Sequence, residues 1–87
     1  MIQGKTKSGF EFQIDKKVLN NMELVESLSD VDKGDISELP KVLVAVLGSA
    51  GKKELYEHLR TEDGRVPIDL LLEEVKQIFE ASKEIKN

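Results

Sequence analysis

Residues 10–15 read FEFQID and mark the point where the chain changes from strand to helix. Phe10, Phe12 and Ile14 alternate with polar residues, and this period of two predicts a β-strand with one buried face. Asp15 follows at once, and a short acidic side chain before an apolar helical pattern is typical of a helix N-cap. The sequence therefore predicts that a strand leads directly into helices.

A second strand precedes this one. Residues 2–6 can pair with it, because Lys7-Ser8-Gly9 between the two supplies a glycine that tolerates the positive φ of a tight turn. We therefore expect a β-hairpin over residues 1–14. A hairpin alone is marginally stable in water, so it needs helices to pack against.

Apolar residues recur at helical spacing through the rest of the chain. The predicted helices cover about residues 16–29, 38–47, 50–60 and 68–85. Ser37 is the expected cap and Pro40 the expected first-turn residue of the second helix, and Gly48 ends it. The predicted fold class is α+β and mostly α, with an N-terminal β-hairpin packed on a bundle of about four helices.

The helical periodicity also predicts which side chains face the core. In the first helix these are Val18, Leu19, Met22, Val25 and Leu28. The acidic stretch from Ser29 to Asp35 has no apolar period and reads as a loop. Leu70 does not fit this scheme, because it lies off the apolar stripe of the last helix. It either belongs to a broadly buried helix start or forms an exposed patch for a partner or a second copy.

Length and composition restrict the classes of function. The 87 residues fit one domain, 1–87, whose small core makes self-association plausible. The net charge is -4, and because residues 1–17 carry four lysines against Glu11 and Asp15, the helical remainder carries -6. Such a surface repels phosphate backbones, which argues against direct nucleic-acid binding. The sequence has no cysteine, no membrane-length apolar run and no apolar signal-peptide core, so we expect a cytoplasmic protein without a membrane partner.

Three features of the sequence resemble parts of binding or catalytic sites, and a purely structural role explains each of them better. The aspartates of residues 30–35 miss the glycine and the final glutamate of a calcium loop. Residues 48–53 lack the spacing of a phosphate-binding loop. His58 is the only histidine, with only helix neighbours such as Glu54 and Glu62 in view. We therefore predict no catalytic residue, no cofactor and no metal, and no enzymatic activity.

The order of several segments resembles that of a known family. The segments are residues 39–48 (LPKVLVAVLG), 55–67 (LYEHLRTEDGRVP) and 74–79 (EVKQIF), preceded by the basic hairpin. This succession resembles the small tail assembly chaperones encoded by long-tailed phages and prophages of Gram-positive bacteria. The resemblance covers nearly the whole chain. It implies a non-catalytic protein of the host bacterial cytoplasm.

The resemblance also implies partners. Such a chaperone binds the tape measure protein, keeps it soluble and recruits tail tube subunits. Apolar residues left over from the small core would cover apolar faces of partner helices, and the hypothesis assigns this role to Leu70, Val44, Val66 and Pro67. Two alternatives remain at this point: a head-tail connector or other structural phage protein, and an acidic inhibitor of a DNA-handling host protein.

Overall fold

The computed structural model describes the backbone of residues 1–84 and the side chains of residues 1–82. Two antiparallel strands, β1 (Ile2–Lys5) and β2 (Glu11–Ile14), form the hairpin that the alternating pattern predicts. Gly4 lies opposite Phe12 in this pair. The Phe12 ring covers Gly4 so closely that a Cβ atom there would lie 2.6 Å from it. Glycine thus allows the ring to pack across the strand.

The predicted first helix is divided into two. Helix α1 covers Lys16–Leu19, helix α2 covers Met22–Asp32, and Asn20 and Asn21 separate them. Asp15 accepts a hydrogen bond from the backbone N–H of Lys17, which confirms it as a cap. The unexpected break has the same physical basis, because the Asn21 side chain accepts from the N–H of Glu23 and starts a new helix.

The boundaries around the second predicted helix also differ in detail. Helix α2 continues through the stretch expected to be a loop as far as Asp32, and Gly34 then takes a positive φ of 106°. A 3-10 helix, η1, covers Ile36–Glu38. Ser37 is therefore not the cap, because it lies inside η1 and its N–H donates to the side chain of Asp35.

Helix α3 covers Leu39–Leu59 and contains a sharp interruption at Gly48. This residue has φ 80° and ψ 167°, a conformation that only glycine adopts without strain. The interruption lies where the sequence predicts the end of one helix and the start of another. The α3 region is therefore two helical halves joined at Gly48.

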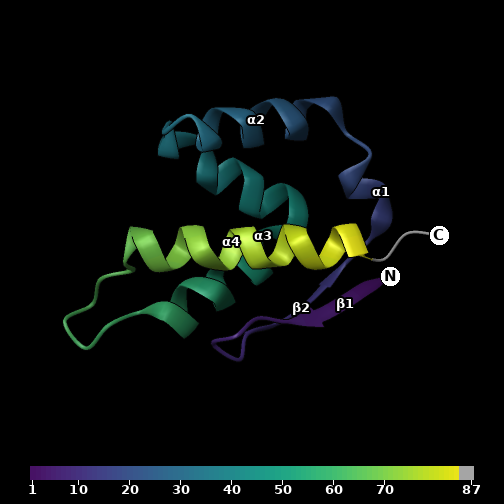
Figure 1. Ribbon diagram of the computed structural model, residues 1–87. Coiled ribbons are helices and arrows are strands. Elements are labelled where there is room, and N and C mark those ends of the chain that lie inside the picture. The colour runs from purple at the N-terminus through teal and green to yellow at the C-terminus, as the bar shows by residue number, and fades with distance from the viewer. Residues whose placement is uncertain (85–87) are drawn as a thin grey trace.

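Helix α4 covers Ile68–Glu84, and the expected extension to Ile85 lies outside the described residues. Figure 1 shows α2 above α4, the first half of α3 between them, and the hairpin below. Helix α3 packs against α2, α4 and β2, so it is central to the fold. The core contains Ile2, Phe10, Phe12, Ile14, Leu24, Leu39, Val42, Leu43, Val46, Leu55, Leu59, Leu71, Val75 and Ile78.

The arrangement confirms the predicted fold class. A two-stranded N-terminal hairpin packs on a mostly helical body, and its inner face supplies four side chains to the shared core. Among the helices of residues 1–84, none combines the length and the apolar character that crossing a membrane requires.

Candidate functional site

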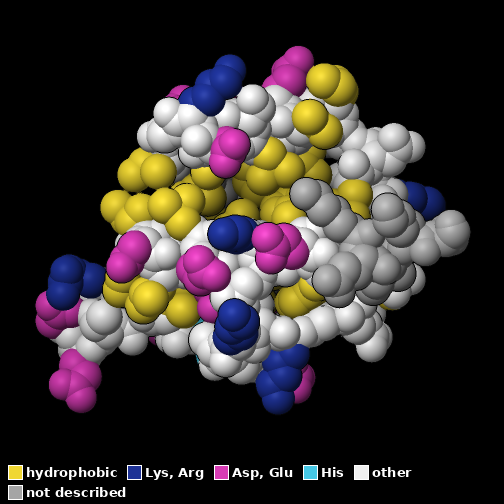
Figure 2. Space-filling model, in the orientation of Figure 1, with side chains coloured by type: hydrophobic (Ala, Val, Ile, Leu, Met, Phe, Trp, Pro, Cys, Tyr) yellow, Lys and Arg dark blue, Asp and Glu magenta, His cyan; other side chains and the backbone are white. Residues whose placement is uncertain are grey.

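A groove between α2 and α4 is lined by apolar side chains, most of which the core covers only in part. Its lining from α2 is Val25, Leu28, Ser29, Val31 and Asp32, and its lining from α4 is Leu72, Val75, Lys76, Phe79 and Glu80. Figure 2 shows the continuous apolar surface between the two helices, with charged side chains along its border. An apolar surface bordered by polar residues is typical of a protein-binding site.

Val25 illustrates how this groove arises. The helical pattern predicts that it faces the core, but 48% of the residue is exposed. Its neighbour Leu24 is buried in its place, because α2 turns that side toward α3. Met22, also expected in the core, is exposed for the same reason. The sequence does contain a signal for the groove: the apolar face of α2 is wider than one neighbouring helix can cover.

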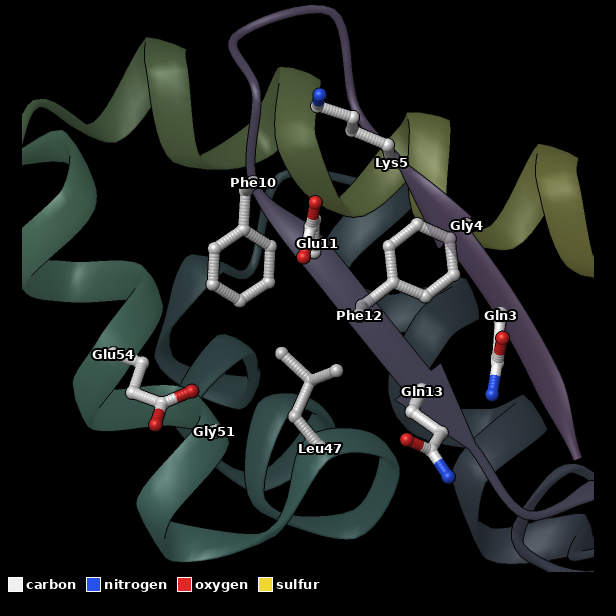
Figure 3. A pocket seen from close by; sticks show the side chains of 10 residues that line it. All are labelled: Gln3, Gly4, Lys5, Phe10, Glu11, Phe12, Gln13, Leu47, Gly51 and Glu54. Carbon is white, nitrogen blue, oxygen red and sulfur yellow. The ribbon is translucent and has the colours of Figure 1, made fainter.

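A second hollow lies beside the hairpin and has a different character. Its volume of about 740 Å³ is close to the 790 Å³ of the groove, so size does not distinguish the two. Figure 3 shows Lys5, Glu11, Gln13 and Glu54 around it, with the Phe10 and Phe12 rings and Leu47 beneath. Its polar border and small apolar area make the α2–α4 groove the better candidate for binding a helix.

The residues that the sequence suggests for partner binding do not line the groove. Leu70 is 47% exposed and Val44 is 41% exposed, so both are available at the surface. Val66 and Pro67 are partly buried, and Val66 packs against the core. The structure thus places apolar surface at Leu70 and Val44 as well as in the groove.

A polar cluster joins three segments that are distant in sequence. The hydroxyl of Ser8 in the hairpin turn donates to Glu74 Oε2 on α4 at 2.9 Å. His58 Nε2 on α3 lies 3.0 Å from the same hydroxyl and 3.2 Å from the Ser8 carbonyl oxygen. The backbone N–H of Lys7 donates to Gln77 Oε1 at 2.8 Å. These bonds attach the hairpin turn to the C-terminal end of α3 and to the middle of α4.

The structure differs from the sequence-based expectation at two residues of this cluster. His58 has neighbours from other segments, since the Phe10 ring lies 5.6 Å from its ring in addition to Ser8. Glu74 is an acidic residue of an amphipathic helix, for which the sequence predicts a surface position, but it is 4% exposed and its Oε1 has no partner among the described residues. Pairings across 50 and 66 residues leave no periodic signal.

The order of the cluster is unlike that of a hydrolase triad. In a triad the histidine lies between the serine and the carboxylate and takes the proton of the serine. Here the serine lies between the other two, and its proton points toward Glu74. The Ser8 carbonyl oxygen can only accept, so His58 Nε2 donates to it and does not take the proton of the Ser8 hydroxyl. The cluster is arranged to hold the hairpin turn in place.

The turn between α3 and α4 has its own ion pairs. Arg60 pairs with Glu57 at 2.7 Å, and Arg65 pairs with Asp63 at 2.9 Å. The Arg60 hydrogen bond and charge lower the pKa of Glu57. The Thr61 hydroxyl and then Arg65 lower the pKa of Asp63. Both carboxylates are at the surface, so these interactions shape the turn and contribute little to stability.

Nothing in the described part of the chain groups three or more histidine and acidic side chains in a way that could hold a metal ion. Comparisons with models of protein families, with curated protein sequences and with solved structures give no match for this chain. The α2–α4 groove and its charged border are therefore the features from which a function is inferred.

Proposed function

We propose that this protein is a non-catalytic tail assembly chaperone of a long-tailed phage or prophage. It binds the helix-rich tape measure protein in the host cytoplasm, keeps it soluble and recruits tail tube subunits. The observation that carries the binding part of this proposal is the apolar groove between α2 and α4. The resemblance of residues 39–79 to the chaperone family supplies the identity of the partners.

The groove suits this role because it is open and apolar and can accommodate about two turns of a helix. Its α4 wall runs from Leu72 to Glu80 and its α2 wall from Val25 to Asp32. At 1.5 Å per residue these walls measure about 11 to 12 Å, about two turns of a bound helix. A helix laid between them would bury its apolar face against Val25, Leu72 and Phe79, which is a common mode of peptide recognition.

The proposal is tested by co-expressing the chain with the tape measure protein from the same locus. We expect the tape measure protein to become soluble and to co-purify with the wild-type chain. The double variant Val25→Asn/Leu72→Asn should lose both effects, because it places amide groups on both walls of the groove. Val25→Asn alone is the safer variant, since Val25 is half exposed and its replacement costs the fold little.

Leu70→Asn and Val44→Asn are the matched controls. Both remove an exposed apolar side chain outside the groove lining. If the groove is the binding surface, these variants keep the tape measure protein soluble. If they lose it while Val25→Asn/Leu72→Asn retains it, the binding surface lies at Leu70 and Val44. A tape measure protein that stays insoluble beside the wild-type chain overturns the proposed function.

A further inference from the structure

The groove has a charged border on its α4 side. Asp69, Glu73, Lys76 and Glu80 follow one another at spacings of four, three and four residues, so they lie in one row along the helix. All four are exposed. The row adjoins the apolar row that includes Leu72 and Phe79. A helix seated in the groove would therefore have this row against one edge of its apolar face.

The α2 side is uniformly acidic. Its 11 residues include Glu23, Glu26, Asp30 and Asp32 and no lysine or arginine. All four acidic side chains are exposed, and Asp32 lines the groove. None of the ion pairs found among the described residues involves them. The two sides thus differ. Helix α2 contributes one charged side chain to the lining, Asp32, and has no basic residue, whereas α4 contributes Lys76 and Glu80, with Glu73 beside them in the same row.

We propose that the groove selects an amphipathic helix by the charges beside its apolar face. The edge that faces α2 carries lysine or arginine. The edge that faces α4 carries a basic, an acidic and a basic residue at spacings of three and four, opposite Glu73, Lys76 and Glu80. This inference rests on the proposed function, because it assumes that the groove is the partner-binding surface.

The chemistry of the side chains supports this choice of occupant. Lysine and arginine can lay their aliphatic stems on an apolar surface while the charged head reaches a carboxylate at its border. Val25 and Leu72 provide such a surface, Glu80 provides a carboxylate in the α4 lining, and the exposed Glu73 provides another beside it in the same row of the helix. An acidic helix would instead meet like charge at Asp32 on the α2 side and at Glu80 on the α4 side, and only Lys76 would attract it. Like charge at an interface opposes binding and slows association. Charge complementarity therefore favours a basic-edged helix over a second copy of the acidic α2.

The inference is tested with two helix-stapled peptides that share one apolar face. The first has lysine on the α2 edge and Lys-Glu-Lys on the α4 edge, and the second has every charge reversed. Binding to the full chain is measured by fluorescence anisotropy at low and high salt. We expect the first peptide to bind about tenfold more tightly at low salt, and the difference to shrink at high salt as the surface charges are screened.

Variants of the protein locate the effect. Glu73→Lys/Glu80→Lys should weaken binding of the first peptide and strengthen binding of the second. The matched control Glu54→Lys/Glu62→Lys makes the same change in charge at exposed positions that belong to neither α2 nor α4, and it should preserve the preference. Equal binding of the two peptides, or a preference that survives Glu73→Lys/Glu80→Lys, would overturn the inference.

The outcomes separate this inference from the proposed function. If Glu73→Lys/Glu80→Lys still solubilises the tape measure protein and both peptides bind alike, the charge rule fails and the chaperone function stands. If the peptides are discriminated but the tape measure protein is not bound, the proposed function fails and the groove's selectivity stands. If sedimentation shows a wild-type dimer that excludes both peptides and that Val25→Asn converts to a monomer, the groove's occupant is a second copy and the inference is overturned.

Discussion

Ser8 is a surface residue whose hydroxyl donates a hydrogen bond to a buried acidic side chain. It donates to the Glu74 carboxylate, which receives no other hydrogen bond within the described residues. A buried acceptor that loses its donor costs about 1 to 3 kcal/mol, and more if it is charged. We therefore expect Ser8→Ala to lower the free energy of unfolding by about 2 kcal/mol, measured by urea denaturation followed by circular dichroism.

Two further variants identify the cause of this loss. Ser8→Ala/Glu74→Leu should recover most of the stability, because a leucine needs no hydrogen bond at the buried position. Ser29→Ala changes an exposed serine of α2 and should have an effect within about 0.5 kcal/mol. If Ser8→Ala is as mild as Ser29→Ala, the hydroxyl does not stabilise the Glu74 carboxylate.

At the scale of the element, Gly48 decides the shape of α3. Its φ of 80° divides the helix into two halves, and the space around it would accept a Cβ atom without a contact closer than 4 Å. A substitution there is therefore strained by its backbone angles and not by crowding. We expect Gly48→Ala to destabilise the fold by about 1 to 3 kcal/mol, measured as a fall in the urea midpoint.

Whether Gly48→Ala lowers or raises the stability tests whether the fold needs the interruption of α3. If α3 can straighten into one continuous helix, alanine would instead stabilise the protein by about 1 kcal/mol through its higher helix propensity. Ser49→Ala, an exposed neighbour, controls for the general effect of adding alanine to this region. A stabilising Gly48→Ala would mean that the core does not require the interruption.

The sequence predicts the interruption of α3 but not that of the first helix. Glycine at position 48 ends an apolar run, and this signal is local. Asn20 and Asn21 have no comparable signal, because asparagine is tolerated inside a helix as well as at its start. The Asn21 side chain caps α2 once that helix has turned toward α3. Packing therefore selects between two local structures that the sequence alone permits.

At the scale of the whole molecule, the hairpin completes the core. Ile14 is 0% exposed, while Val25 on α2 lies at the groove and is half exposed. Deleting a fully buried aliphatic side chain costs about 2 to 5 kcal/mol. We expect Ile14→Ala to cost this much in thermal or urea unfolding, and Val25→Ala to cost less than about 0.5 kcal/mol.

Since a small domain is stable by only about 5 to 15 kcal/mol in total, Ile14→Ala would remove a large share of its stability. Val25→Ala would leave the fold intact. We therefore expect the Val25 side chain to contribute to partner binding at the groove and little to stability. If Val25→Ala is as costly as Ile14→Ala, α2 packs more tightly against α4 than an open groove allows.

The fold class, the hairpin and the break at Gly48 follow from local sequence patterns, because each depends on residues close together in the chain. The exposure of Val25 and Met22, the burial of Glu74 and the contact between Ser8 and His58 arise from the packing of distant segments. Periodicity states which side chains share a face of a helix, but not how much of that face a neighbouring helix covers. The coverage depends on how α2, α3 and α4 pack together, and this packing leaves the groove open.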